Sequence, residues 1–389
     1  MSIELNNNVY IVKGKKFDCI YNLNNRRLYR INKSMSEFID EIILLDESDY
    51  ITLSKNQRRI IKALSENEIL VTGKSKANAI DYRPEIDIDM AWIEITQKCN
   101  FRCIHCYEGD KLQKAMAFDN VIYCIDRLIE HGVKKLQIIG GEPLLHSSIE
   151  QILEYCKGKF DEFSIFTNAS FVTERICKLL KELNSSVYIS LHSDIETEFD
   201  AFTGTKGMLP KVLQNVDYMR EYGLNAVLKR VKVKSVSVST EYEAMQFGLN
   251  GFPVLVGHAK LEQYDDEMLK KKLITEKSFS ELLDVESVIN NMNLQYCFSK
   301  KVYIDVNLDV FPCILERRRK HGNLLKSNLS DIINIEICRF TKDNIEDCKD
   351  CEYRYACNTC FPDTASENFS AKPWFCTYNP REGIWENTI

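Results

Sequence analysis

The distribution of cysteines is the feature that most constrains how this chain can fold. The chain has 389 residues and 15 cysteines, an odd number that cannot all pair as disulfides. Three cysteines lie within residues 99–106, and seven more lie between residues 297 and 376, or eight if Cys338 is counted. Cysteines that only fill a hydrophobic core would not gather in two such groups, so both groups indicate metal ligands. The other four are expected to be small buried hydrophobic residues: Cys19, Cys124, Cys156 and Cys177.

The composition excludes several classes of protein. Hydrophobic residues make up 44% of the chain and charged residues 28%, as in ordinary soluble globular proteins, and the length predicts two or three domains. A formal net charge of −6 gives no basic surface for nucleic acid, and no long apolar run predicts a membrane span. The first residues lack the pattern of a secretory signal. We therefore expect a cytoplasmic protein without nucleic-acid or membrane partners, whose thiols do not form disulfides because that compartment is reducing.

Residues 1–84 predict a small winged-helix-like domain. Short apolar runs indicate strands, and apolar stripes that repeat about every 3.6 residues indicate helices. The expected strands are Val9–Val12, Asp18–Asn22, Arg27–Arg30 and Ile69–Thr72, and the expected helices are Met35–Leu45 and Lys55–Leu64.

Residues 85–260 predict an α/β fold of parallel strands with helices outside, because apolar runs alternate with helical segments. The expected strands are Trp92–Thr96, Leu136–Ile139, Phe163–Thr167, Val187–Leu191, Ala226–Val233 and Pro253–Val256. The expected helices are Asp119–His131, Ser148–Lys157, Glu174–Leu183, Pro210–Tyr222 and Glu241–Phe247. Six such units are too few for a closed eight-unit barrel, so we expect a partial, TIM-like (β/α)6 barrel. Residues 261–295 predict a helical bridge, and residues 296–389 a cysteine-rich domain with little regular structure.

The first cysteine group follows the expected strand Trp92–Thr96 in the pattern C-x3-C-x2-C, formed by Cys99, Cys103 and Cys106. Three thiolates on one loop can hold three irons of a 4Fe–4S cluster, which leaves the fourth iron for a substrate. The alternative is a zinc site that these cysteines share with His105. Loops after the C-terminal ends of barrel strands are where active sites lie, which favours the iron–sulfur interpretation.

The next expected strand ends in Gly140-Gly141-Glu142-Pro143, where two glycines allow a ligand close to the backbone and Glu142 offers a carboxylate to an ammonium group. Together with the cysteine motif, this segment resembles the radical S-adenosylmethionine (SAM) family. The resemblance implies a 4Fe–4S cluster on the three cysteines and a SAM molecule whose amino group is held by residues 140–143. It also implies further SAM contacts at later strand ends, at Thr167, Asn168 and Ser190.

Two positions depart from the pattern of that family. Ala169 stands where a glycine is usual, and Thr203 occupies the place of an arginine that often lies near the SAM carboxylate. We expect the missing positive charge to come from Lys206, Lys229 or Arg230.

The second cysteine group is similar to the SPASM domain that follows the barrel in many radical SAM enzymes of peptide modification. Its core spacing is C-x2-C-x5-C-x2-C over residues 348–360, where the family has x3 in the last gap. The resemblance implies two auxiliary 4Fe–4S clusters. The first would use Cys297, Cys313 and Cys360, and the second would use Cys348, Cys351, Cys357 and Cys376. The alternative is zinc, which two C-x2-C pairs often bind.

The first auxiliary cluster is thus assigned only three cysteines. Some family members have another cysteine where this chain has Tyr303. One hypothesis is that an iron of this cluster stays open for a substrate thiolate. The rival hypothesis is that Cys338 folds back as the fourth ligand.

The residue after Cys313 bears on the reaction. Family members that oxidise a sulfatase cysteine or serine place an aspartate there as proton acceptor, whereas this chain has Ile314. Asp305, Asp309 and Glu316 are the candidate proton acceptors that remain nearby. This departure counts against a sulfatase-maturing enzyme.

A winged-helix-like domain before such a core resembles the leader-recognition element of enzymes that mature ribosomally made peptides. A leader would add as a strand to a sheet edge within Val9–Arg30, beside a groove lined by Met35–Leu45. A stabilising appendage is the plain alternative.

These features predict a radical SAM enzyme that installs an intramolecular crosslink, with a thioether favoured, in a precursor peptide with a leader. An external one-electron reductant would be its other partner. A peptide-oxidising radical SAM enzyme and a non-catalytic zinc- or peptide-binding protein are the alternatives.

Overall fold

The computed structural model describes residues 3–45, 51–73, 76–104, 106, 113–230, 237, 273–358 and 371–386. The chain forms two compact units, and each of them joins segments that are far apart in sequence. Unit 1 comprises residues 1–85, 270–295 and 339–389, and unit 2 comprises residues 86–269 and 296–338. The N-terminal segment therefore shares one unit with the end of the chain. The second cysteine group is divided between the two units.

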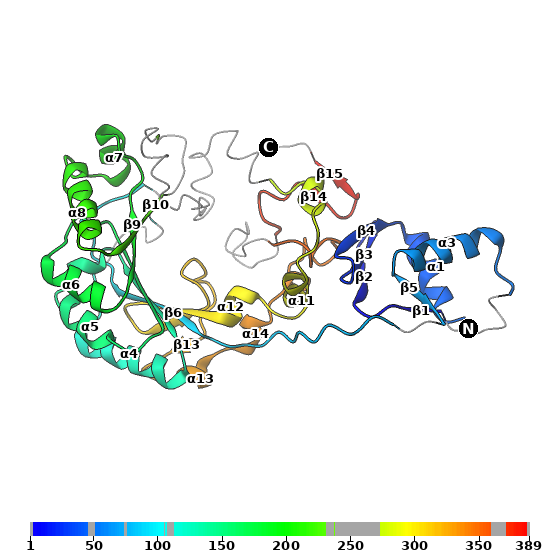
Figure 1. Cartoon of the computed structure of the whole chain (residues 1–389), viewed down its shortest axis with the longest axis horizontal. Helices are drawn as coiled ribbons and strands as arrows, with labels where there is room; N and C mark the ends of the chain where they lie inside the picture. Colours follow the sequence, from blue (N-terminus) through cyan, green and yellow to red (C-terminus); the bar gives the residue numbers. More distant parts are fainter. Residues whose placement is uncertain are drawn as a thin grey trace. The chain divides into compact units, whose positions relative to one another are not determined.

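Unit 2 is built on one sheet, which among the described residues has the strand order β10-β9-β8-β7-β6-β11-β12-β13 (Figure 1). Its parallel strands are β6 (Met90–Thr96), β7 (Lys135–Gly140), β8 (Glu162–Thr167), β9 (Ser186–Ser190), β10 (Asn225–Lys229) and β11 (Lys301–Ile304). The antiparallel strands β12 (Asp309–Phe311) and β13 (Gly322–Asn323) extend one edge. This open parallel sheet confirms the predicted partial barrel. The expected strand Pro253–Val256 and helix Glu241–Phe247 lie outside the described residues.

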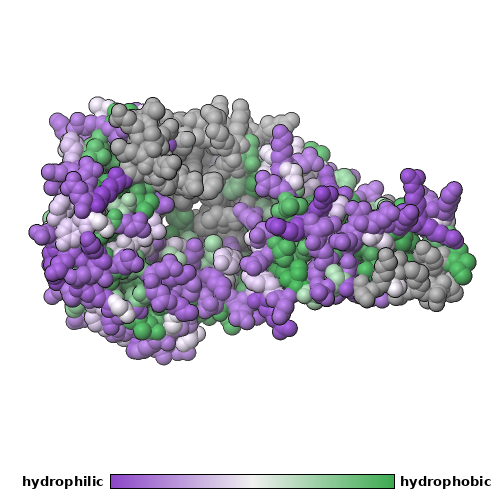
Figure 2. All heavy atoms as spheres, in the orientation of Figure 1, coloured by the Kyte–Doolittle hydropathy of each residue, from purple (hydrophilic) through white to green (hydrophobic). Residues whose placement is uncertain are grey.

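Helices cover one face of this sheet (Figure 1). The long ones are α4 (Phe118–His131), α5 (Ile149–Cys156), α6 (Glu174–Glu182) and α8 (Leu209–Glu221), all at predicted positions. Helix α7 (Glu196–Thr203) has no counterpart among the predicted helices. Short elements are η1 (Pro143–Leu145), α12 (Tyr296–Lys300), α13 (Leu329–Ile332) and α14 (Ile335–Cys338). The outward surface over α5, α6 and α8 is mostly hydrophilic, as amphipathic packing requires (Figure 2).

Strand alternation divides the side chains of β6 between two environments. Ala91, Ile93 and Ile95 are completely buried in the hydrophobic core beneath the helices. Trp92 and Glu94 therefore face the opposite side, the inner face of the sheet. On that face Trp92 donates a hydrogen bond to Gln137 of β7, whose amide donates to the Ser164 hydroxyl of β8 at 2.8 Å.

Unit 1 begins with the predicted winged-helix-like pattern. Strands β2 (Val9–Lys13), β3 (Asp18–Asn22) and β4 (Arg27–Ile31) form an antiparallel sheet, and β1 (Ile3–Leu5) pairs with β5 (Leu70–Thr72). Helix α1 (Lys33–Ile42) is capped by Asn32, and α3 (Lys55–Glu66) has a capping box formed by Ser54 and Gln57. Strand β1 has no predicted counterpart.

The remainder of unit 1 has short elements only, within the described residues. They are η3 (Glu276–Phe279), α11 (Val285–Asn293), η4 (Lys342–Asn344), β14 (Tyr378–Asn379) and β15 (Ile384–Trp385). This agrees with a cysteine-rich region of little regular structure. Across the described part of the chain, no helix combines the length and apolar character that crossing a membrane requires.

Candidate functional site

The loop after β6 places the three cysteines of the first group at the C-terminal edge of the parallel sheet. Cys99 and Cys103 are half-buried against the hydrophobic core of unit 2, and Cys106 is also half-buried. The backbone N–H of Cys106 donates to the carbonyl of Cys103 at 3.0 Å, which closes a turn between these two thiols. The three predicted ligands thus lie half-buried on one loop that follows β6.

The end of α7 anchors this loop through its backbone. Arg102 N–H donates to the carbonyl of Thr203 at 2.7 Å, and Ile104 N–H donates to the carbonyl of Phe202 at 3.0 Å. The Thr203 hydroxyl is itself used within the helix, since it donates to the carbonyl of Phe199 at 2.7 Å. The residue in the family's arginine position therefore supports the cysteine loop through its carbonyl group.

The two glycines of the GGEP segment are needed because this backbone runs against the start of the cysteine loop. Gly141 N–H donates to the carbonyl of Thr96 at 2.7 Å, and Glu142 N–H donates to that of Lys98 at 2.8 Å. A Cβ atom added to Gly140 would lie 2.3 Å from the Thr96 carbonyl oxygen, and one added to Gly141 would lie 2.5 Å from that of Lys98. Any other residue would push the two ligand-bearing segments apart.

Glu142 is completely buried, and its carboxylate joins the segment after β7 to the end of β8. One carboxylate oxygen accepts from Leu144 N–H at 3.0 Å and from the Thr167 hydroxyl at 2.7 Å. The other accepts from Asn168 N–H at 2.6 Å. The family resemblance implies that residues 140–143, Glu142 among them, hold the SAM amino group. The structure shows an additional role for the Glu142 side chain, which is to align the residues predicted to contact SAM.

Asn168 extends this network to the cysteine loop. Its side-chain amide donates to the Asn100 side-chain oxygen at 3.0 Å and lies 3.8 Å from the sulfur of Cys99. The backbone N–H of Phe101 donates to the same sulfur at 3.4 Å. Hydrogen bonds of this kind to ligand sulfurs adjust the reduction potentials of iron–sulfur clusters. The loop and its surroundings therefore fit an iron–sulfur cluster.

The other predicted SAM contacts lie at neighbouring strand ends. Ser190 ends β9 and pairs with Lys229, the last residue of β10, whose ammonium group lies 5.2 Å from the ring centre of Tyr188. Ala169 has φ of +56°, a left-handed conformation that explains why the family prefers glycine here. Thr167 and Ser190 are the last residues of β8 and β9, and their contacts with SAM stay a prediction.

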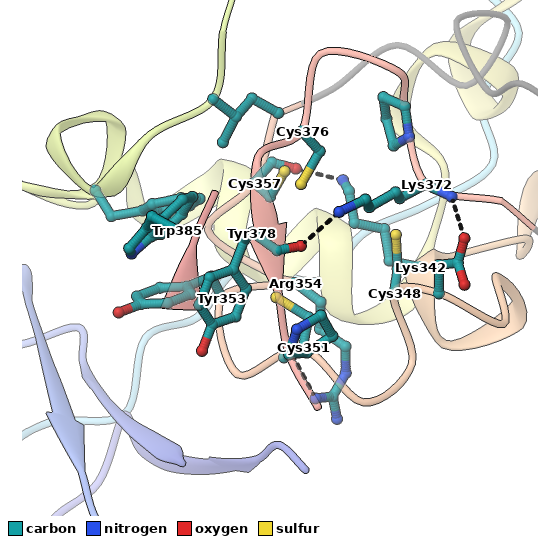
Figure 3. A pocket seen from close by; sticks show the side chains of 15 residues that line it. Lys342, Cys348, Cys351, Tyr353, Arg354, Cys357, Lys372, Cys376, Tyr378 and Trp385 are labelled. Atoms are coloured by element: carbon teal, nitrogen blue, oxygen red, sulfur yellow. Dashed lines mark hydrogen bonds between the residues drawn. The ribbon is translucent and has the colours of Figure 1, made fainter. Parts of the chain in front are cut away.

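Four cysteines of the second group line one cavity in unit 1. Figure 3 shows the sulfurs of Cys348, Cys351, Cys357 and Cys376 arranged around it. Burial raises the pKa of Cys348 to about 12, with the nearby thiols of Cys357 and Cys376 acting in the same direction. Burial also raises the pKa of Cys351 and of Cys376. These four are the cysteines predicted for the second auxiliary cluster.

Positive charge and aromatic rings surround this cavity. The Lys342 ammonium donates to the Cys357 carbonyl, and Lys372 donates to the Tyr378 carbonyl at 2.8 Å (Figure 3). Tyr353 and Trp385 line another part of the wall. The cavity thus combines four sulfur ligands with cations that can offset thiolate charge. Among the described residues, no three histidine, cysteine or acidic side chains are grouped closely enough for a single metal ion.

Two cysteines of the first auxiliary set lie near each other in unit 2. Burial raises the pKa of Cys313, and the neighbouring thiol of Cys297 raises it further. Cys360, predicted as their partner, lies outside the described residues. Cys338 is completely buried on α14, where its thiol donates to the carbonyl of Phe298 at 3.2 Å. Burial raises the pKa of Cys338 to about 11.

Tyr303, in the position of the family's additional cysteine, has a completely buried ring on the inner face of the sheet. Its hydroxyl accepts a hydrogen bond from Arg317 at 2.6 Å, and the Arg317 guanidinium also lies over the ring. The Arg317 guanidinium also lies 3.8 Å from a carboxylate oxygen of Glu94. Glu94 is a completely buried carboxylate that sequence reasoning missed, because it lies within an apolar strand.

The three candidate proton acceptors are all engaged elsewhere. Asp305 accepts from the backbone N–H groups of Asn307 and Asp309, and so forms the turn between β11 and β12. Asp309 pairs with Lys320 at 2.5 Å. Glu316 is completely buried and pairs with Arg318 at 2.5 Å.

Comparison with known proteins identifies the sheet that positions the first site. Residues 93–240 match the model of the Radical SAM superfamily, which covers β6 to β10 and the first cysteine group. This chain contains a radical SAM domain. Radical SAM domains bind a 4Fe–4S cluster and SAM, in agreement with the geometry of the Cys99–Cys106 loop.

The curated relatives match less than half of the chain. The chain is 33% identical over 144 residues to the GTP 3′,8-cyclase of Listeria welshimeri, covering 35% of this chain and 43% of the relative. It is 26% identical over 138 residues to the subtilosin biosynthesis protein AlbA of Bacillus subtilis, covering 34% and 31%. The chain thus spans about a third to a half of the length of the curated relatives it matches.

Solved structures match more of the fold. SuiB of Streptococcus suis, bound to its precursor peptide SuiA, matches with a TM-score of 0.56 and 15% identity over 97% of this chain and 100% of that chain. The enzyme anSMEcpe with bound AdoMet matches with a TM-score of 0.55 and 15% identity over 75% and 94%. The fold of the radical SAM domain and of the regions around it is therefore shared with these proteins.

Proposed function

We propose that this protein is a radical SAM peptide maturase that installs an intramolecular crosslink, with a thioether favoured, in a ribosomally made precursor peptide. The observation that supports it most strongly is the combination of a radical SAM domain with a separate four-cysteine cavity in unit 1. When bound, the cluster and SAM supply a 5′-deoxyadenosyl radical, which removes a hydrogen atom from the substrate.

The residues of the radical SAM domain have distinct proposed roles. Cys99, Cys103 and Cys106 would hold the cluster, and the backbone of residues 140–143 would meet the SAM amino group. Thr167, Asn168 and Ser190 would contact the remainder of SAM. The carboxylate of Glu142 supports this arrangement, because it fixes Thr167 and Asn168 relative to the GGEP segment.

The auxiliary clusters would accept the electron that a crosslinking reaction releases. Cys348, Cys351, Cys357 and Cys376 would hold one of them, in the cavity of unit 1. Cys297 and Cys313, with Cys360, would hold the other. Since the thiol of Cys338 is directed to the Phe298 carbonyl, we favour a first auxiliary cluster with one iron that this chain does not ligate. A substrate thiolate is the proposed ligand.

Binding of a leader peptide is proposed for the first 84 residues. Strands β2 and β4 are the edges of the three-stranded sheet among the described residues, so either can pair with an extended peptide. The share of this chain that each of two solved structures covers supports this proposal. SuiB, which was crystallised with a precursor peptide, matches 97% of this chain, whereas anSMEcpe matches 75%.

The surroundings of Cys313 favour crosslinking over simple oxidation. The residue after Cys313 is Ile314, where sulfatase-maturing enzymes have an aspartate. Its side chain packs in a small hydrophobic cluster with Tyr303 and Phe311. The candidate acceptors Asp305, Asp309 and Glu316 are paired with other groups. A peptide-oxidising enzyme of the sulfatase-maturing kind is the second candidate, supported by the shared fold of anSMEcpe.

Two assays on anaerobically purified protein test the proposal. Dithionite-reduced protein with SAM should release 5′-deoxyadenosine. Co-expression with a cysteine-containing small open reading frame beside the gene should yield a peptide two hydrogens lighter, with a linkage that tandem mass spectrometry locates. An aldehyde without a crosslink would support the oxidising alternative. Iron-loaded protein that leaves SAM intact, or protein that binds only zinc, would refute the proposal.

A further inference from the structure

Strand β3 is buried on both faces, which is unusual for a small three-stranded sheet. Ile20 faces α1 and α3 in one hydrophobic cluster. Cys19 and Tyr21 face the other way, into a cluster with Tyr353 and Tyr378 from the end of the chain. The second face of the sheet therefore packs on the segment that bears the ligands of the second auxiliary site.

The hydroxyl of Tyr21 bridges the stretch between two predicted ligands of that site. It donates to the carbonyl of Glu352 at 2.9 Å and accepts from the backbone N–H of Ala356 at 3.3 Å. Both partners lie between Cys351 and Cys357. The backbone around the β2–β3 turn adds two bonds, from Lys15 N–H to the Asp350 carbonyl at 2.8 Å and from Arg354 to the Lys13 carbonyl at 2.9 Å.

The most specific contact joins Arg30 of β4 to Glu352, the residue after Cys351. Glu352 is completely buried, and its Oε1 accepts from Arg30 Nε at 3.2 Å and from the Tyr378 hydroxyl at 2.5 Å. Arg30 also donates to Tyr378 at 3.0 Å and to the Gly383 carbonyl at 2.6 Å, and its guanidinium stacks over Phe17. These contacts hold both the arginine and the carboxylate in fixed positions.

The charge balance explains why this arginine matters. A buried carboxylate is costly unless it is paired with a cation. Glu352 lies beside the cavity lined by four cysteines, and each of these thiols would also be negatively charged when it is deprotonated. Its second oxygen has no hydrogen-bond partner among the described residues. Removal of Arg30 would leave this charge without its cation, and the cost of burying it would then weaken the placement of the Cys351 loop.

We infer that the N-terminal sheet is a structural part of the second auxiliary cluster site, and that Arg30 positions the Cys351 loop through Glu352. The inference rests on the proposed function, because it requires a cluster at Cys348, Cys351, Cys357 and Cys376. It also joins the sheet proposed to bind the leader with the loop proposed to hold that cluster. Arg30 and Glu352 both belong to unit 1, and the radical SAM domain belongs to unit 2.

The test compares full-length variants purified anaerobically. Arg30→Ala should lose about four of about twelve irons per chain, together with the corresponding EPR signal, and should still convert SAM to 5′-deoxyadenosine. Arg27→Ala is the matched control, because Arg27 is an exposed arginine on the same strand, and it should keep the iron content of the wild type.

A double variant separates the charge effect from a general loss of packing. In Arg30→Ala/Glu352→Gln the buried charge is absent, so iron content should recover well above that of Arg30→Ala. Tyr21→Phe removes only one hydroxyl, so it should lose less iron than Arg30→Ala. It replaces Arg30→Ala in the test if that variant does not fold. Wild-type iron content and EPR spectra in both Arg30→Ala and Tyr21→Phe would overturn the inference. Absence of iron from the wild type would instead refute the proposed function.

Discussion

The two cysteine sites that the structure describes most fully differ in what holds them in place. The Cys99–Cys106 loop is attached to a parallel sheet with a large hydrocarbon core, and backbone bonds from Thr96, Phe202 and Thr203 fix its course. The four-cysteine cavity of unit 1 is enclosed by turns, very short strands and the neighbouring N-terminal sheet. A cluster bound to the first site would be held by a scaffold that has its own large hydrophobic core. A cluster in the second site is expected to be part of what makes its surroundings fold.

The largest expected effect tests the first site. The variant Cys99→Ala/Cys103→Ala/Cys106→Ala should reduce 5′-deoxyadenosine formation to the background rate, because it removes all three cysteines predicted to hold the cluster that binds SAM. Chromatographic quantification after dithionite reduction measures this. The fold should persist, with an unchanged circular dichroism spectrum and about eight of the irons retained. SAM cleavage that survives in this variant would contradict the site assignment.

A large effect on stability is expected at the second site. Cys348→Ala/Cys351→Ala should lose about four irons and lower the unfolding temperature of unit 1, because binding free energy contributes to folding at such sites. Calorimetry together with iron analysis measures both. Cys177→Ala is a suitable control, since that residue is a buried cysteine of α6 in unit 2. An unfolding profile identical to that of the wild type would show that unit 1 does not depend on its cluster.

A moderate effect is expected from Glu142→Gln in the radical SAM domain. The carboxylate of Glu142 now accepts hydrogen bonds from N–H and hydroxyl donors. In the variant, the NH₂ group of the new amide would face one of these donors, which should lower the free energy of unfolding by about 1–3 kcal/mol. We expect weaker SAM binding and a lower free energy of unfolding, measured by calorimetric titration and by chemical denaturation. Unchanged SAM affinity would show that the Glu142 network does not position the SAM contacts.

The smallest effect is expected at Cys338. Because its thiol bonds to the Phe298 carbonyl, Cys338→Ala should keep the full iron content and should cost only about 1 kcal/mol of stability from lost packing. Iron analysis and the EPR spectrum of the first auxiliary cluster test this. Loss of iron without peptide present would establish Cys338 as the fourth ligand, and the proposed open iron would then be excluded.

What could be predicted from the sequence also differs between the site in unit 2 and the site in unit 1. In unit 2 the motifs lie at the ends of apolar strands, and periodicity located β6 to β10 and thus the Cys99 loop. The hydrogen bond from Thr167 to Glu142 could not be predicted, because it depends on how far apart the ends of β7 and β8 lie in space. Glu94 was missed because a single carboxylate in the segment Trp92–Thr96 does not disturb the apolar pattern.

In unit 1 the sequence predicted the ligands but not their setting. The cysteine spacing indicated Cys348, Cys351, Cys357 and Cys376, which do line one cavity. Nothing in the spacing shows that Tyr21 and Arg30 would pack against residues more than 300 positions later. Such contacts are specified by shape and charge at long range, where local patterns carry no information.

The metal content of anaerobically purified wild-type protein, with its Mössbauer spectrum, tests the central claim most directly. The claim is that this chain holds one 4Fe–4S cluster on the radical SAM loop and two on the cysteines of the second group. It predicts about twelve irons per chain, little zinc, and a spectrum of cubane clusters. About four irons, or zinc in place of the auxiliary irons, would contradict it.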